Sequence, residues 1–194
     1  MKVTNILISG VGGQGLVLAT QILAETAFKE GYDIKTSDVI GLSQRGGMVW
    51  GSVRFGPKVY SALIPDGQGD ILMAMEALEG LRCAKMLRRG AKVILADEKT
   101  YPNRVLIEKE EYPDNIEEQL KMLGLQVITV KPQEEAKKLG NIKTSNILQM
   151  GVLSTRLPFS SDTWVEVISQ NVPKSTIQAN ITAFDRGREL GTIS

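Results

Sequence analysis

The first candidate for binding chemistry is a glycine-rich turn near the start of the chain. Gly10, Gly12 and Gly15 match the spacing of the dinucleotide-binding fingerprint. An apolar run, 3–8, precedes the turn and an amphipathic stretch, 16–29, follows it, so we expect it between a strand and a helix. Glycines there let a ligand approach the backbone, and the first N–H groups of a helix attract anions. The candidate cofactor-binding residues of this turn are Gly10, Gly12, Gly13, Gln14 and Gly15.

The acidic residue that would complete a dinucleotide site is misplaced. In such sites it closes the second strand and binds the ribose hydroxyls. Asp33 opens the expected second strand, 33–37, and Asp38 follows it. Two interpretations therefore stay open. Either the turn binds a nucleotide-like anionic group, or its glycines only let the first helix pack close to the sheet.

A second candidate is the segment Ser43–Gly47, with the sequence SQRGG. Arg45 stands between a polar pair and two glycines, directly before an expected strand, and packing alone explains such an arginine poorly. Its guanidinium is a forked donor suited to carboxylates and phosphates. The alternative is an ordinary connection with a solvated arginine. The candidate catalytic residues are Arg45 and Gln44, and the candidate binding residues are Ser43, Gly46 and Gly47.

The composition excludes several kinds of chemistry. The chain has no histidine and one cysteine, Cys83. Histidine is the usual general base near neutral pH, so Ser-His and Cys-His schemes are excluded. A [4Fe–4S] cluster takes four thiolates, and a structural zinc site takes Cys and His ligands that are missing here. We therefore expect no metal site, and we expect Cys83 to be a small core residue of a helix.

Length and charge favour an ordinary globular protein. The 194 residues fit one domain, 1–194. The formal net charge of +1 is too balanced for a generic nucleic-acid binder. No apolar run approaches the roughly 18 residues of a membrane helix, and residues 1–30 lack the charged start of a signal peptide. We expect a cytoplasmic protein that binds neither nucleic acid nor membranes.

These candidate residues need a scaffold, and the apolar pattern predicts an α/β fold. We expect a mostly parallel, doubly wound (Rossmann-like) sheet with a β-hairpin insertion and a helical C-terminus. The hairpin is expected from two alternating stretches, 49–55 and 59–64. Ligands of such sheets bind at the carboxyl edge, where we place both glycine segments. Further strands are expected at 70–75, 92–96, 105–107 and 126–130, and further helices at 76–89, 115–123, 132–139, 145–155, 161–170 and 175–190.

Taken together, the two glycine segments resemble a known family. GVGGQG at 10–15, followed by GLSQRGG at 41–47, is similar to the gamma domain of 2-oxoacid:ferredoxin oxidoreductases. The SQRGG form resembles the indolepyruvate ferredoxin oxidoreductase beta subunit in particular. One departure is Gly41-Leu42, where the indolepyruvate group often has a His before Gly-Met, which leaves the particular 2-oxoacid open. The resemblance continues at Asp70–Glu76, Asn146, Gly151, Asn180, Ala183, Phe184 and Gly187.

The resemblance implies a subunit that is inactive alone. Enzymes of this family oxidatively decarboxylate a 2-oxoacid, here an aryl pyruvate such as indolepyruvate, to acyl-coenzyme A. Thiamine diphosphate, Mg²⁺ and the [4Fe–4S] clusters are then carried by a large partner subunit, and electrons pass to ferredoxin. Coenzyme A is a co-substrate, and its phosphate would suit the first glycine turn. Gly69-Asp70 resembles the start of a thiamine-diphosphate Mg²⁺ motif, but no Asn stands roughly 25–30 residues on to complete it.

Two other functions stay open, and so does the mode of assembly. One alternative is a stand-alone NAD(P)-binding oxidoreductase with a Rossmann fold that uses the first glycine turn. The other is a nucleotide-sensing or scaffold module without a catalytic partner. For an accessory subunit, the expected docking surface includes the hairpin 49–64 with Trp50. The isolated chain could form a homodimer through the same region.

Overall fold

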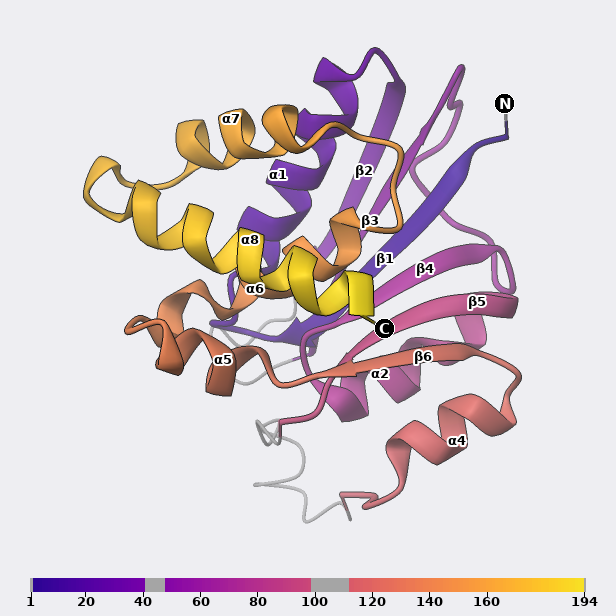
Figure 1. Ribbon diagram of the computed structural model, residues 1–194. Coiled ribbons are helices and arrows are strands. Elements are labelled where there is room, and N and C mark those ends of the chain that lie inside the picture. Colours follow the sequence, from indigo (N-terminus) through magenta and orange to yellow (C-terminus); the bar gives the residue numbers. More distant parts are fainter. Residues whose placement is uncertain (1, 41–47, 99–111, 194) are drawn as a thin grey trace.

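The computed structural model describes residues 2–40, 48–98 and 112–193. Its centre is one six-stranded sheet with the order β2-β3-β1-β4-β5-β6 (Figure 1). Parallel pairing joins β1 to β4, β4 to β5 and β5 to β6, whereas β3 is antiparallel to both of its neighbours. The strands are β1 (Thr4–Val11), β2 (Asp33–Ile40), β3 (Met48–Gly56), β4 (Gly69–Ala74), β5 (Leu87–Ala96) and β6 (Gln126–Val130).

Helices cover both faces of the sheet, as the sequence predicts. The central strands alternate so that Ile6 and Ile8 face one core, while Leu7 faces the other. The first core packs under α1 (Leu16–Lys29), α6 (Ser145–Ser154), α7 (Ser161–Asn171) and α8 (Ile177–Ile193). The second packs under α2 (Ala77–Cys83) and α4 (Ile116–Met122), and α5 (Pro132–Lys138) follows β6 beside α6 (Figure 1). Among the described residues, no helix is both long and apolar enough to cross a membrane.

The predicted hairpin is wrong in its second strand. Described residues 57–68 contain no strand, and β3 instead turns back against β2 and inserts between β2 and β1. A side chain of β3 holds the segment that follows this strand. Arg54 Nη1 donates hydrogen bonds to the carbonyl oxygens of Ser61 and Leu63, at 2.8 and 2.7 Å. The alternating apolar residues of this segment do not form one face of a strand. Val59 and Ile64 are each buried separately.

Trp50 does not stand on an exposed hairpin. It is half-buried in β3 and packs against the second core. The apolar side chains that this region exposes are Tyr60 and Leu63, in the irregular segment after β3. The surface predicted for docking is therefore not a hairpin, and docking through residues 49–64 stays a prediction.

The predicted helix 76–89 is also wrong in its second half. α2 ends at Cys83, a 3₁₀ turn covers Ala84–Met86, and β5 begins at Leu87. Leu87 is buried in the second core, and this packing outweighs the helical pattern. Gly90 has a φ of 76°, but it sits inside the first part of β5 instead of ending a helix.

Two glycines bring α6 and α8 into unusually close contact. A Cβ atom at Gly187 would overlap the carbonyl oxygen of Leu148, and one at Gly151 would overlap the carbonyl oxygen of Phe184. Only glycine allows the two backbones to approach this closely. The contact fixes α6 beneath α8 and so sets the position of α6 over the carboxyl ends of the strands.

Candidate functional site

The first glycine turn lies at the topological switch point of the sheet. β1 and β4 are parallel neighbours, and the helices that follow them, α1 and α2, cover opposite faces. In doubly wound sheets the crevice at this point, outside the carboxyl ends of the strands, is where ligands bind. A cavity of about 700 Å³ opens there, and all of Gly12 to Gly15 line it.

The amino terminus of α1 faces this cavity without a side-chain cap. Gly15 is the cap residue, with a φ of 79°, and it has no side chain to accept a hydrogen bond from the first turn. The first turn also contains no acidic residue. Free N–H groups and the helix dipole make such a terminus a binding place for an anion. Gly13, with a φ of 101°, has open space where a side chain would stand, so the backbone is accessible.

Gln14, predicted as a ligand-binding residue, holds the turn together. Its Oε1 accepts a hydrogen bond from Val11 N at 2.9 Å, and its Nε2 donates to the carbonyl oxygen of Met75 at 2.9 Å. Both ends of the amide are therefore used within the protein. A Cβ at Gly10 would lie 2.6 Å from Gln14 Oε1, which explains the glycine there. In this structure Gln14 and Gly10 shape the turn, and the open backbone is left for a ligand.

The opposite wall of the cavity comes from α6 and the turn before it. Asn146 is buried, and its Oδ1 accepts from Ile147 N at 2.9 Å. A Cβ at Gly15 would lie 2.5 Å from Asn146 Nδ2, so glycine is needed at the cap for α6 to approach. Asn146 is thus a structural tie between α1 and α6.

Lys143 is a functional candidate that sequence reasoning missed. It lies in the 3₁₀ turn Ile142–Thr144 just before α6 and lines the cavity. Its side chain is exposed, and within the described part of the chain no carboxylate forms an ion pair with it. An unpaired ammonium and an uncapped helix terminus around one cavity favour an anionic ligand. Only the fold brings residue 143 beside residue 13, so the sequence offers no local signal for it.

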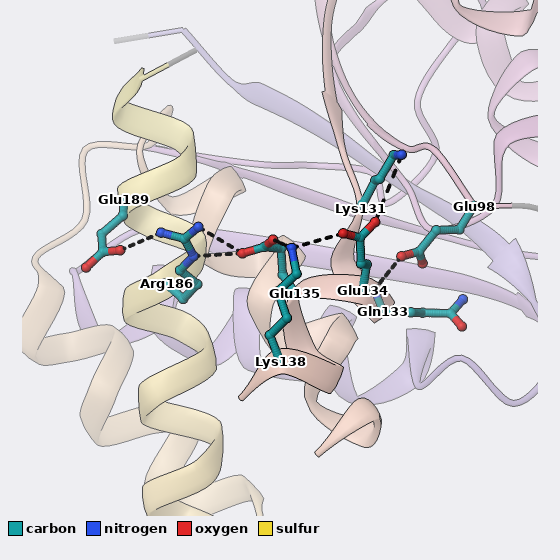
Figure 2. A network of polar contacts seen from close by, with 8 residues as sticks. All are labelled: Glu98, Lys131, Gln133, Glu134, Glu135, Lys138, Arg186 and Glu189. Carbon is teal, nitrogen blue, oxygen red and sulfur yellow. Dashed lines mark hydrogen bonds and ion pairs between the residues drawn. The ribbon is translucent and has the colours of Figure 1, made fainter. Parts of the chain in front are cut away.

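Glu98 adds a carboxylate to the same cavity. Its Oε1 accepts hydrogen bonds from Gln133 N and Glu134 N at 2.7 and 2.9 Å, which caps the first turn of α5 (Figure 2). Its Oε2 is buried and has no hydrogen-bond partner within the described residues. Burial raises the pKa of this carboxyl, and nearby Glu134 and Asp97 add to that effect, while the two N–H groups oppose it.

An ion-pair network continues from this cap to the C-terminal helix (Figure 2). Arg186 of α8 contacts Glu135 of α5 at 2.9 Å and Glu189 at 3.0 Å. Lys138 also pairs with Glu135, at 2.7 Å. These contacts hold α5, and with it the Glu98 cap, against α8. The wall of the cavity at α5 is therefore connected to α8, one of the helices that cover the first core.

Gln149 is another residue of the cavity that the sequence did not indicate as functional. It is 1% exposed and lines the cavity from α6. Its Nε2 donates to the carbonyl oxygens of Ala74 and Ile94, at 2.8 and 3.1 Å. Those carbonyls lie at the carboxyl ends of β4 and β5, so the side chain bridges the sheet edge below the cavity. A glutamine inside an apolar helix sequence is the only local signal for this role.

The SQRGG segment lies outside the described residues, and with it lie Ser43, Gln44, Arg45, Gly46 and Gly47. Its flanks are described. β2 ends at Ile40 and β3 begins at Met48, which pairs with Val11 at the end of β1. Both ends of the segment therefore stand at the carboxyl edge, next to the first glycine turn. The predicted proximity of the two glycine segments stays a prediction for the side chains themselves.

The predicted strand at 105–107 also lies outside the described residues. Cys83, in contrast, is described and buried in the second core. Burial and the charge of Glu79 raise the pKa of its thiol to about 11. It is a core residue, as predicted. Among the described residues, no group of three or more His, Cys, Asp or Glu side chains is arranged to hold a metal ion.

The strand order argues against a dinucleotide ribose at this turn. The acidic residue of a dinucleotide site closes a strand that neighbours β1, but here β3 separates β2 from β1. Asp33 begins β2 at the opposite edge, where its carboxylate accepts from Val59 N at 2.9 Å. β2 is longer than predicted and includes Asp38, so this residue does not follow the strand.

A family model and curated relatives match nearly the whole chain. The model of the family described as pyruvate ferredoxin/flavodoxin oxidoreductase matches residues 5–190. The chain is 36% identical to indolepyruvate oxidoreductase subunit IorB of Thermococcus kodakarensis, and the match covers 96% of this chain and 95% of that one. It is 34% identical to the subunit of the same name from Archaeoglobus fulgidus, with 94% and 92% covered.

Solved structures share the fold. The gamma subunit of a keto/oxoacid ferredoxin oxidoreductase from Geobacter sulfurreducens superposes with a TM-score of 0.73 at 23% identity, over 98% of this chain and 99% of that chain. A 2-oxoglutarate:ferredoxin oxidoreductase from Magnetococcus marinus, solved with 2-oxoglutarate, coenzyme A and succinyl-CoA bound, gives a TM-score of 0.80 at 21% identity. That match covers all of this chain and 32% of the larger one.

Proposed function

The chain belongs to the pyruvate ferredoxin/flavodoxin oxidoreductase family, and from that premise we propose that it is the small subunit of an indolepyruvate ferredoxin oxidoreductase. The large subunit carries out oxidative decarboxylation of indolepyruvate or another aryl pyruvate. This subunit binds coenzyme A in the cavity at the first glycine turn and presents it to the reacting acyl group. Electrons leave through the large subunit to ferredoxin.

The observation that carries the coenzyme A proposal is the positive character of the cavity entrance. The α1 terminus is uncapped, and Lys143 has no ion-pair partner among the described residues. Coenzyme A is rich in phosphate, and backbone N–H groups at a helix terminus bind phosphate. The related Magnetococcus enzyme, whose chain contains a domain of this fold, was solved with coenzyme A bound.

The redox and thiamine cofactors do not fit this chain. One cysteine, itself buried in the second core, is too few for a [4Fe–4S] cluster. Asp70, which resembles the start of the thiamine Mg²⁺ motif, lies at the amino edge of the sheet, away from the cavity. Its carboxylate already accepts from Asn5 N at 2.9 Å and from Arg88 Nε at 2.7 Å. We therefore assign both cofactors to the large subunit.

A stand-alone NAD(P)-dependent oxidoreductase is the less favoured function. β3 occupies the place next to β1 where a dinucleotide fold has the strand with the ribose-binding carboxylate. The chain also has no histidine to move a proton near neutral pH. We expect NAD(H) to bind weakly or not at all.

Reconstitution tests the proposal. The chain and the thiamine-diphosphate subunit would be purified separately and mixed, and indolepyruvate oxidation measured with coenzyme A and ferredoxin. We expect activity only from the mixture, and we expect the isolated chain to be colourless. Turnover by the isolated chain would contradict the proposal, and so would a large subunit whose activity does not change when this chain is added.

A further inference from the structure

The amide of Gln149 has a fixed orientation. Its Nε2 lies 2.8 Å from the carbonyl oxygen of Ala74 and 3.1 Å from that of Ile94. Carbonyl oxygens only accept hydrogen bonds, so the atom facing them must be the donating nitrogen. The oxygen and nitrogen of this side chain therefore cannot be exchanged. Oε1 is held on the other side of the amide, away from the two strand ends.

This Oε1 has no hydrogen-bond partner among the residues that the structure describes. The residue is 1% exposed and lines the cavity at the glycine turn. The oxygen itself is not sealed from the cavity, so a molecule bound there can donate a hydrogen bond to it. An acceptor of fixed orientation that lines a cavity, on a residue otherwise buried and without a partner for it among the described residues, points to a donor that comes with the ligand.

Two kinds of binding group line the cavity, groups that attract an anion and oxygens that accept hydrogen bonds. The α1 terminus and Lys143, which both line the cavity, attract an anion. Gln149 Oε1 adds an acceptor to the lining, and Glu98 adds a buried acceptor oxygen without a partner among the described residues. A complementary ligand carries a phosphate and, at some distance from it, an N–H donor. Leu18 and Met75 add apolar side chains to the lining.

We infer that Gln149 is a specificity-determining residue, which accepts a hydrogen bond from an N–H group of the bound ligand. The inference rests on the proposed binding of coenzyme A and deepens it. Coenzyme A offers such a group at two places, the amino group of adenine and the amides of the pantetheine arm. Both present the same donor chemistry to Oε1, and fragments of coenzyme A distinguish them.

The test is calorimetric titration of the full chain with three ligands: coenzyme A, adenosine 3′,5′-bisphosphate and 4′-phosphopantetheine. Gln149→Met has nearly the same length and volume but no acceptor oxygen. Gln170→Met, on the exposed surface of α7, is the matched control. One hydrogen bond in a sheltered site corresponds to about a tenfold change in affinity. We expect Gln149→Met to weaken coenzyme A and one of the two fragments by about tenfold, and Gln170→Met to change neither.

The outcomes separate this inference from the proposed function. If coenzyme A binds the unchanged chain and Gln149→Met binds it equally well, Gln149 does not select the ligand and the inference is wrong. If neither coenzyme A nor a fragment binds the unchanged chain, the proposed function fails and the inference fails with it.

Gln149→Met also removes the bonds to Ala74 and Ile94, so a loss of folding must be distinguished from a loss of recognition. Ligand analogues do this on the unchanged protein. Adenosine 3′,5′-bisphosphate with hydrogen in place of the 6-amino group lacks the first donor, and phosphopantetheine with N-methylated amides lacks the second. We expect one of the two changes to cost about tenfold in affinity. Full affinity of both analogues would overturn the inference.

Discussion

Gln14 Nε2 lies 2.9 Å from the carbonyl oxygen of Met75, so the glycine turn after β1 is hydrogen-bonded to the end of β4. The same side chain accepts from Val11 N, also at 2.9 Å. The amide of Gln14 therefore connects the end of β1 to the end of β4. The helices that follow these two strands cover opposite faces of the sheet.

Replacing this amide should weaken the fold and loosen the turn. Gln14→Leu leaves the Val11 N–H and the Met75 carbonyl without partners. We expect a loss of about 1–3 kcal/mol in the free energy of unfolding, measured by urea denaturation. Gln170→Leu, at an exposed position of α7, is the control and should change the free energy little. A Gln14→Leu protein of unchanged stability would show that the amide is not a tie.

The carboxyl of Glu98 should make the protein less stable as pH rises from acid to neutral. Its pKa in the folded state is raised, chiefly by burial. The folded protein therefore holds this proton more tightly than the unfolded chain. The contribution of the protonated form is complete below the ordinary pKa of a glutamate, and it is lost as pH rises through the raised value.

Glu98→Gln removes this titration and keeps an oxygen for the two N–H groups of α5. We expect the melting temperature of Glu98→Gln to exceed that of the unchanged protein at pH 7, and the difference to shrink toward pH 4. Thermal unfolding at a series of pH values measures it. Glu118→Gln, on the exposed side of α4, should not show this trend. A constant difference at all pH values would show that the buried charge of Glu98 does not cause the effect.

Local sequence patterns predict those parts of the site that are formed by residues close to one another in the sequence. The glycine turn, β1 and the bounds of α1 follow from neighbouring residues, and the structure confirms all three. Gln149 of α6 and Lys143 of the turn before it reach the cavity only because the fold brings this part of the chain to the sheet edge, more than 120 residues after the glycine turn. No local sequence pattern marks either residue, since tertiary packing decides which side of a buried helix and of the turn before it meets a cavity.

The errors in the predicted fold have a similar origin. The alternation at 59–64 and the helical pattern at 84–89 are both real, but each is satisfied by contacts from other parts of the chain. Arg54 binds the backbone of the first stretch, and the second core buries Leu87 of the second. Hydrophobic period alone cannot distinguish a strand from an irregular segment that is anchored at two points.

The α6–α8 contact should tolerate no side chain at its centre. Gly187→Ala would place a methyl group against the backbone of Leu148, which belongs to a helix and cannot move freely. We expect a loss of about 3 kcal/mol in the free energy of unfolding, at the upper end of the usual cost of overpacking. Urea denaturation measures it. Thr182→Ala, exposed on the same helix, is the control, and equal stability of the two variants would refute the packing argument.

Arg45 is the residue that we expect to matter most for activity. The ends of its segment stand beside the glycine turn at the carboxyl edge, where the cavity opens. A guanidinium there can pair with a carboxylate or phosphate of the substrate, of coenzyme A or of the large subunit. Such a charge-assisted contact, sheltered from water, is worth about 1.5–3 kcal/mol, or roughly ten- to a hundredfold in rate or affinity.

Arg45→Ala should therefore lower 2-oxoacid oxidation by the reconstituted complex at least about tenfold, with little change in the melting temperature of the isolated subunit. Arg45→Lys should fall between the two, because it keeps the charge and loses the fork. Lys58→Ala, which removes an exposed cation near Asp33 at the other edge of the sheet, is the control and should leave the rate unchanged. Full activity of the Arg45→Ala complex would show that Ser43–Gly47 only connects β2 to β3. If the variant unfolds the isolated chain, Arg45 is instead a structural tie, and its assignment to the site is wrong.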